Sequence, residues 1–522
     1  MIKRPKSPVH LDESTLDWAL LHLRRSGDTI FVPRAFEYDA IQHDWVRIRA
    51  WLSARDMRSW TPRPWRRFLA TKTAGSFRYI TQLDPLEHLA FAALMRSVGA
   101  ELEEGRVART LQTVFSWRFV PQPDGTLYDP TVGWVEFNDR CSELAAGPSI
   151  QRIVVADIAD FFPHVGLQAV ERTLAQCAST QNYAYCVFRL LMKWTARAPY
   201  GIPVGPPSCR VLADATLAQL DNALSQDGAI YCRYSDDCRI FCNDESDARR
   251  RLEFLATHLF DMYGLTLQSS KTAIYAVDEF LAHFAMSPER LEAEGLESKL
   301  DDLLDAAGVD RDYGASIEYA DLPTHVQEEI DRLNISEIVR EQIARPKYDA
   351  VLLSLLLQRL AQLDQDEVVD DLLNNLQHLE PIINSTVRYL SELRITSLER
   401  CAAIGKQIIN TLQRNGTSAY QAMCLLSIFA ESASFDNSDE LESLFADASE
   451  AGRRELVLAF RQVRNERWFV AARDSKAFGP WLRRAFLAGT SCLSAAQRAE
   501  FLHTYLVRED VLEQAIVNWA TA

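Results

Sequence analysis

The sequence of 522 residues lacks the features of a membrane-spanning, secreted or zinc-binding chain. It contains no run of about 18 apolar residues, which a transmembrane helix would need. Its first residues, Met-Ile-Lys-Arg-Pro-Lys, do not lead into the apolar core of a signal peptide. The ten cysteines include no CxxC pair, so neither a zinc site nor a disulfide framework is indicated. We therefore expect a cytoplasmic protein with reduced thiols and no membrane partner.

The chain also lacks an excess of basic over acidic side chains. The formal net charge is −16; residues 1–290 carry 33 basic and 34 acidic side chains, and residues 291–522 carry 23 and 38. Proteins that grip a long duplex by its phosphates are usually basic. Extended contact with a long template–primer duplex is therefore not expected, although local basic stripes such as Arg63–Arg67 are present.

Carboxylates stand at the ends of three β-prone segments. Two short runs flank Asp236 and Asp237, which is typical of a hairpin with an acidic pair at its tip. The apolar run 153–156 predicts a central strand with Asp157 at its end, and Asp160 is the rival carboxylate there. Adjacent carboxylates repel, so keeping them ionised normally requires a cation. Such a cluster would suit two metal ions about 3.5–4 Å apart, the arrangement used in phosphoryl transfer.

A loop rich in glycine and proline, residues 200–208, lies between these segments. Gly201 and Gly205 allow close backbone approach, and the prolines stiffen the loop. Ser208 is a candidate N-cap for the amphipathic run that continues to Asp221. Such a loop alone is most often a turn, so its meaning depends on the segments around it.

Taken in order, these segments resemble the motifs of the reverse-transcriptase family. The resemblance spans roughly residues 60–285, and its residues fall into five short stretches. Residues 157–162 resemble motif A, residues 201–208 motif B, residues 234–237 motif C and residues 267–272 motif D. Residues 72–78 resemble the basic fingers segment of the family.

The resemblance implies a metal site. Asp157, Asp236 and Asp237 would be the ligands, with the backbone carbonyl of Ile158 completing one coordination shell. Two Mg²⁺ ions, or Mn²⁺ in their place, would be the cofactors. The reaction implied is the transfer of a nucleotide from a dNTP.

The resemblance also implies contacts with the nucleotide. Phe162 would be the steric gate that crowds a ribose 2′-hydroxyl and so favours deoxynucleotides. Lys72 and Arg78 would neutralise the β- and γ-phosphates, Gly205 would approach the nucleotide through its backbone, and Lys271 would act near the leaving pyrophosphate as a general acid.

One position departs from the family pattern. Val204 stands where many reverse transcriptases carry glutamine in motif B. A polar contact to the nucleotide or template is therefore in doubt, whereas catalysis itself is not.

The chain changes character after about residue 290. We expect an α+β right-hand polymerase fold, with an N-terminal helical extension (1–60), fingers (61–150) and a palm (151–290). An all-helical, HEAT-like repeat domain (291–522) would stand in place of a standard thumb, and an irregular helical bundle is the alternative. Helices are predicted from three- and four-residue apolar spacing at 325–342, 347–362, 365–378, 384–395, 397–414, 417–432, 451–464, 479–488, 494–507 and 509–520.

This architecture resembles the abortive-infection (Abi) and related phage-defence reverse transcriptases of bacteria. Residues 115–119 and the Gly-Ile-Pro-Val-Gly-Pro sequence of motif B also resemble that group. The resemblance implies homo-oligomers and a single-stranded DNA product that is primed by a protein hydroxyl, in some members without a template, and stays covalently attached. Tyr38 is the first candidate for the priming residue. The competing tyrosines are Tyr313, Tyr319, Tyr348, Tyr389, Tyr420 and Tyr505.

Two other functions are weighed against this one. A reverse transcriptase that copies a dedicated non-coding RNA would have an RNA partner and a basic, nucleic-acid-binding segment after residue 285, which the acidic composition does not favour. A non-catalytic scaffold would have no need for a complete set of three carboxylates and a gate aromatic. We therefore expect an active enzyme.

Overall fold

The computed structural model describes residues 2–29, 31–73, 75–195, 200–285, 295, 299, 323–414, 416–472 and 479–522. The chain separates into two compact units, each of which gathers segments that are far apart in the sequence. The first unit comprises Met1–Thr29, Trp45–Arg67 and Tyr79–Arg290, and the second comprises Ile30–Asp44, Phe68–Arg78 and Leu291–Ala522.

The first unit is built around a four-stranded antiparallel sheet in the order β4-β5-β3-β6. Its strands are β3 (Arg152–Asp157), β4 (Ile230–Tyr234), β5 (Asp237–Cys242) and β6 (Ala273–Ala276). The strand predicted at 153–156 is indeed an inner one, because its four consecutive apolar residues are buried and both its edges are paired.

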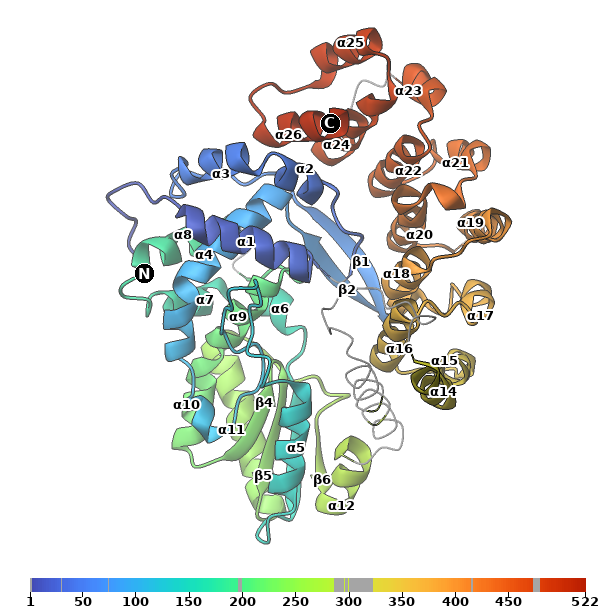
Figure 1. Ribbon diagram of the computed structural model, residues 1–522. Coiled ribbons are helices and arrows are strands. Elements are labelled where there is room, and N and C mark those ends of the chain that lie inside the picture. The colour runs from blue at the N-terminus through green and yellow to red at the C-terminus, as the bar shows by residue number, and fades with distance from the viewer. Residues whose placement is uncertain are drawn as a thin grey trace. The chain divides into compact units, whose positions relative to one another are not determined.

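Helices cover the sheet. α5 (Trp134–Ala145) contacts β4 and β5, and α11 (Glu245–Tyr263) contacts β3 and β5 (Figure 1). Alternate residues of a strand point to opposite faces, so Ile153 and Val155 of β3 share one face. They join a core cluster that also contains Phe137 of α5.

Another helix of the first unit, the buried α4 (Pro85–Glu104), contacts α1, α8 and α9. α4 begins where Asp84 accepts a hydrogen bond from the Leu86 amide, and a proline occupies the first helical position. The other elements are α1 (Glu13–Ser26), α3 (Trp45–Ser53), η1 (Arg109–Leu111), α6 (Phe161–His164), α7 (Leu167–Leu174), α8 (Gln181–Trp194), α9 (Pro207–Thr216), α10 (Ala218–Gln226), α12 (Val277–Phe280) and the π-helix η2 (Leu281–Ala285).

A separate two-stranded sheet is formed by β1 (Arg66–Thr73) and β2 (Ser76–Gln82). The part nearest its turn, Phe68–Arg78, groups with the second unit, whereas the strand ends group with the first. The linear division of the chain into extension, fingers, palm and helical domain did not anticipate such an exchange of segments.

Apart from the strand segments of Phe68–Arg78, the secondary structure of the second unit's described residues is helical. Two regions depart from the predicted helices: the one at 325–342 is divided at Asn334, whose φ is 56°, and the one at 365–378 keeps its helix only over α17. Its elements are α2 (Glu37–His43), α14 (Thr324–Arg332), α15 (Ile335–Ala344), α16 (Ala350–Gln362), α17 (Val369–Asn374), η4 (Glu380–Ile382), α18 (Ile383–Glu392), α19 (Leu398–Leu412), α20 (Ala419–Glu431), η5 (Ala433–Phe435), α21 (Ser438–Leu444), α22 (Glu450–Gln462), α23 (Glu466–Ala472), α24 (Pro480–Gly489), η6 (Thr490–Cys492), α25 (Ala495–Tyr505) and α26 (Val511–Thr521).

Alternate helices of this unit pack in a row. Each of α16, α18, α20, α22, α24 and α26 contacts the next, and α15, α17 and α19 form a second row (Figure 1). Apolar residues at three- and four-residue spacing bury one stripe of each helix against the next. The helical character predicted for this region is therefore confirmed, whereas the HEAT-like repeat stays a prediction.

The early segment of the chain completes the far end of this row. α2 contacts α26, and its Glu37 is fully buried, with Oε2 2.5 Å from Nη2 of the buried Arg454 on α22. A buried charge is tolerated only with such a partner. Within the part of the chain that the structure describes, no helix is long and apolar enough to cross a membrane.

Candidate active site

Two of the predicted carboxylates lie opposite each other at one edge of the sheet. Asp157 is the last residue of β3, and its partner in the antiparallel register is Asp237, the first residue of β5. Directly opposed residues project from the same face, with Cβ atoms about 4.5–5.5 Å apart. The fold therefore brings together two side chains that are 80 residues apart in the sequence.

The third carboxylate lies in the turn between β4 and β5. Tyr234 pairs with Asp237, so Ser235 and Asp236 form a two-residue hairpin turn. Ser235 adopts a left-handed conformation with φ of 56°, which is uncommon for a residue other than glycine. The Asp236 carbonyl accepts a hydrogen bond of 3.0 Å from the Ile158 amide, which ties the turn to the end of β3.

Asp237 is in an unfavourable environment for an isolated anion. Burial raises the pKa of its carboxyl to about 6; Arg239 opposes the rise, and the charges of Asp157 and Asp236 add to it. Its buried Oδ1 receives no hydrogen bond from the described residues, and the nearest cationic nitrogen, Arg239 Nε, is 3.8 Å away. A bound cation would remove this penalty.

Lys271 occupies the position that motif D predicts. Its Nζ lies 3.0 Å from Oδ1 of Asp157, and the lysine side chain is 51% exposed. The backbone supports this approach, because the Gln268 amide donates to the Asp157 carbonyl at 2.7 Å. At the start of this segment Leu267 forms an isolated antiparallel bridge with Ile158, residues 269–271 form a turn, and β6 begins at Ala273.

The residues present fit a divalent metal, although they do not form a closed set of ligands in this arrangement. In the described ranges, no group of three or more His, Cys, Asp or Glu side chains is placed to hold an ion. Asp157 is engaged by the Lys271 ammonium instead. Carboxylate and carbonyl oxygens are the ligands that Mg²⁺ prefers. Oδ1 of Asp237 is buried and receives no hydrogen bond from the described residues, so it is available to bind a metal ion. The assignment of Asp157, Ile158, Asp236 and Asp237 to a metal therefore stays a prediction.

The motif B loop makes the close backbone contacts that its glycines predict. Gly205 has φ of 136°, and a Cβ atom there would lie 2.8 Å from the Thr81 carbonyl oxygen. Gly201 has φ of 102° and would meet the Pro163 carbonyl at 3.1 Å. The Val204 carbonyl accepts a hydrogen bond of 2.8 Å from the Thr81 amide. The loop is therefore joined to β2.

The predicted gate residue lies where motifs A and B meet. Phe162 is half-buried on α6, and its carbonyl accepts a 2.8 Å hydrogen bond from the Ile202 amide. Its neighbour Phe161 is a core residue at 2% exposed. Asp160, the rival carboxylate, is exposed and starts α6 with φ of 42°. The gate role of Phe162 and the nucleotide role of Gly205 stay predictions.

Ser208 is not the N-cap of the following helix, as the sequence had suggested. α9 begins at Pro207, so Ser208 lies inside the first turn and is fully buried. The fixed φ of proline suits the first helical position, and two successive prolines move the start of the helix forward.

Lys72 and Arg78 belong to the part of the β1–β2 sheet that groups with the second unit. Lys72 is exposed, and the Arg78 guanidinium lies 5.1 Å from the Phe31 ring centroid. Their contact with a nucleotide stays a prediction.

Tyr38 is a poor candidate for a priming hydroxyl. It is 1% exposed on α2, whereas a primer must reach a reaction centre. The hydroxyls of Tyr389 and Tyr420 donate to the carbonyls of Gln365 and Phe31. Tyr313 and Tyr319 lie outside the described residues. Tyr348 and Tyr505 are partly buried.

Sequence reasoning missed Arg239, the buried arginine nearest to Asp237, and the side chains that contact it. The Arg239 guanidinium is 2% exposed, donates 2.8 Å to Asn138 Oδ1, and lies 4.4 Å from the Phe137 ring centroid and 5.0 Å from that of Phe284. Aromatic faces stabilise a desolvated cation. The only signal was an arginine two residues after the acidic pair, and hence on the same strand face as Asp237.

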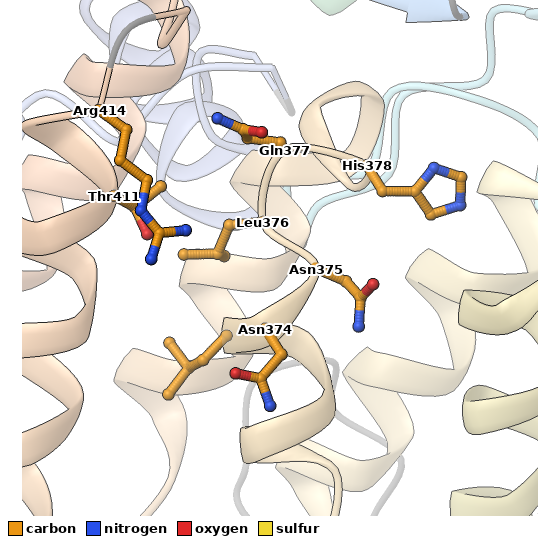
Figure 2. A pocket seen from close by; sticks show the side chains of 8 residues that line it. Asn374, Asn375, Leu376, Gln377, His378, Thr411 and Arg414 are labelled. Carbon is orange, nitrogen blue, oxygen red and sulfur yellow. The ribbon is translucent and has the colours of Figure 1, made fainter.

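A cavity of about 270 Å³ lies in the second unit (Figure 2). Two of its polar side chains are engaged in internal hydrogen bonds: Asn374 accepts from Gln407 at 3.0 Å and Asn375 donates to the Asp371 carbonyl at 2.8 Å. The lining residues are Leu373, Asn374, Asn375, Leu376, Gln377, His378, Thr411 and Arg414.

Comparison with known proteins identifies the domain that holds the carboxylates. Residues 112–298 match the family described as reverse transcriptase (RNA-dependent DNA polymerase). No curated protein matches the sequence. Among solved structures, the telomerase of Candida albicans, in complex with a TWJ fragment of telomeric RNA, aligns with a TM-score of 0.32 and 11% identity, covering 74% of this chain and 70% of that chain. Likeness at that level supports no argument about fold or ligand.

The chain thus contains a reverse-transcriptase domain. The match includes Asp157, Asp236, Asp237 and Lys271, whereas Lys72 lies outside it. Domains of this family are nucleotidyltransferases that bind nucleotides and nucleic acid and generally use divalent metal ions.

Proposed function

We propose that this protein is a reverse-transcriptase-type DNA polymerase that joins dNTPs by two-metal catalysis. The observation that carries the proposal is the pairing of Asp157 with Asp237 at the edge of the sheet, with Asp236 in the adjoining turn. Mg²⁺ held by these carboxylates would supply Lewis-acid activation of the attacking hydroxyl and neutralise charge on the leaving pyrophosphate.

The protein's own side chains would do the rest. The hydroxyl oxygen loses its proton to solvent and forms a bond to the α-phosphorus, while the bond from that phosphorus to the pyrophosphate oxygen breaks. Lys271, on an exposed turn beside Asp157, would donate a proton to that oxygen or neutralise its charge. The half-buried Phe162 would set the sugar preference from the face where motifs A and B meet.

We further propose that this polymerase acts in bacterial phage defence, is primed by a protein hydroxyl and needs no long template. The acidic balance of residues 291–522 supports this, because a segment that tracks a duplex would be basic. The stacked helices of the second unit fit a helical-repeat domain in place of a thumb. Protein priming, a covalently attached DNA product and a homo-oligomer belong to the same proposal.

A second candidate is an RNA-templated reverse transcriptase that acts on a dedicated RNA. The description of the matching family as RNA-dependent favours it. A third, the non-catalytic scaffold, conflicts with the complete set of carboxylates in the domain.

One experiment separates these candidates. Purified full-length protein is incubated with labelled dNTPs and Mg²⁺, with and without an added RNA template and DNA primer. A labelled product that runs with the protein, and is released by either protease or nuclease, supports protein priming. Synthesis only with an added template and primer supports the second candidate. No incorporation under either condition refutes the polymerase proposal.

A further inference from the structure

The turn that carries the acidic pair has no glycine at its left-handed position and is stabilised by hydrogen bonds with side chains. Ser235 adopts φ of 56°, a conformation that most non-glycine residues avoid. Both polar groups of its backbone are bound by side chains. Its amide donates 2.8 Å to Oγ of Ser116, and its carbonyl accepts 2.8 Å from Nη1 of Arg233.

Arg233 is the centre of a buried ion network. It is 0% exposed and makes a bidentate pair with Asp221, through Nε at 2.8 Å and Nη2 at 2.6 Å. Its Nη1 also lies 2.6 Å from Oδ1 of Asp214, and Arg106 binds the other oxygen of that carboxylate. Burial alone would raise the pKa of Asp214, but Arg106 and Arg233 hold it below its usual value. Each carboxylate of the network is thus bound by at least one arginine.

Ser116 links this network to the turn. Its hydroxyl donates 2.8 Å to Oδ1 of Asp214 and accepts from the Ser235 amide, so both of its hydrogen-bonding roles are used in directions that the network dictates. The backbone around it is fixed as well, because the Phe115 amide donates to the Arg233 carbonyl at 3.0 Å and the Arg233 amide donates to the Thr113 carbonyl at 2.7 Å.

We propose that Ser116 is a positioning residue for the acidic turn: through its hydroxyl, the Asp214–Arg233 network sets the conformation of Ser235 and hence the placement of Asp236 and Asp237 as metal ligands. This inference rests on the polymerase function proposed above. Ser116 touches neither substrate nor carboxylate ligand, and it acts through the peptide of Ser235. Metal ligands must be held within fractions of an ångström of their working geometry, and a displacement of 1 Å costs about 100-fold in rate.

The test compares Ser116→Ala, Ser116→Thr and a matched control in the full-length protein. Thr keeps the hydroxyl. The control, Ser427→Ala, removes a hydroxyl of similar burial, 2% exposed, which donates 2.8 Å to the Cys424 carbonyl in the second unit. Three quantities are measured: hydrogen exchange of the peptide containing Ser235, the Mg²⁺ concentration for half-maximal dNTP incorporation, and kcat at saturating dNTP.

The expected results are specific to the turn. Ser116→Ala should speed exchange at Ser235 about tenfold, the equivalent of one lost hydrogen bond, raise the Mg²⁺ requirement and lower kcat by about 100-fold. It should move the KM for dNTP less, Ser116→Thr should restore much of the loss, and Ser427→Ala should change none of the three. Unchanged exchange at Ser235, an unchanged Mg²⁺ requirement, or equal effects of Ser116→Ala and Ser427→Ala would overturn the inference. A wild-type protein without polymerase activity would refute the proposed function instead, and the exchange measurement would still decide whether Ser116 holds the turn.

Discussion

Replacing Asp237 by Asn should inactivate the enzyme and at the same time stabilise its metal-free form. The carboxyl of Asp237 has a pKa raised to about 6, chiefly by burial, from a usual value of 3.8. The folded state therefore binds the proton more tightly than the unfolded state does. The contribution of this carboxyl to the free energy of unfolding is largest at low pH, falls as the pH rises from about 4 to about 6, and is constant above that.

The size of the effect follows from the shift. One pKa unit corresponds to about 1.4 kcal/mol, so a rise to about 6 represents about 3 kcal/mol. The side chain is 26% exposed, so solvent screening reduces this to about 2 kcal/mol. An amide carries no charge to desolvate, and the variant should gain that amount at pH 8, which for a chain of 522 residues corresponds to a Tm increase of about 2 °C.

The assay is thermal unfolding in EDTA at pH 8 and at pH 4, with Asp261→Asn as the control because Asp261 is exposed on α11. The Asp237→Asn gain should be present at pH 8 and nearly absent at pH 4. Added Mg²⁺ should raise the Tm of the wild type and not that of the variant, since a ligand stabilises only the state that binds it. An Asp237→Asn protein that is less stable than the wild type at pH 8 would refute this reasoning.

Three other predictions address further groups of the first unit. Lys271→Met removes the ammonium 3.0 Å from Asp157 and should lower single-turnover kcat by about 100-fold with a smaller change in KM; equal rates in variant and wild type would exclude the general-acid role. Phe162→Ala should relax discrimination against ribonucleotides by about 10- to 200-fold in the ratio of kcat/KM values, and an unchanged ratio would remove Phe162 as the gate. Glu87 is fully buried, and burial raises its pKa to about 8. Wild-type stability should therefore fall by up to about 1.4 kcal/mol per pH unit between about pH 4.5 and pH 8, and Glu87→Gln should flatten that slope in denaturant titrations; identical slopes would contradict it.

The sequence was informative where a local pattern decides the structure. A run of buried apolar residues predicted β3, and two β-prone runs around Asp236 and Asp237 predicted the hairpin, because strand burial and turn chemistry are written in adjacent residues. The resemblance to motifs A and D implied that Asp157 and Lys271 belong to one site, and their side chains lie 3.0 Å apart, whereas their roles stay predictions. Most helices after residue 323 were predicted from their spacing, except for the short α21 and α23, the division of 325–342 and the shortening of 365–378 to α17.

What could not be predicted depends on contacts across long stretches of sequence. Nothing near Glu37 indicates that Arg454, 417 residues later, would bind it in a buried pair. Ser116 and Ser235 are 119 residues apart in the sequence. The residues around Ser116 do not indicate that its hydroxyl will accept a hydrogen bond from the Ser235 amide.

The polymerase function is tested most directly by the catalytic pair itself. Full-length wild-type protein and Asp236→Ala are compared for Mg²⁺-dependent incorporation of labelled dNTPs, with circular dichroism to verify that both are folded. We predict incorporation by the wild type, its loss in EDTA, and no detectable incorporation by the folded Asp236→Ala protein. Incorporation by Asp236→Ala at the wild-type rate would contradict the assignment of the turn as the metal-binding centre of a polymerase.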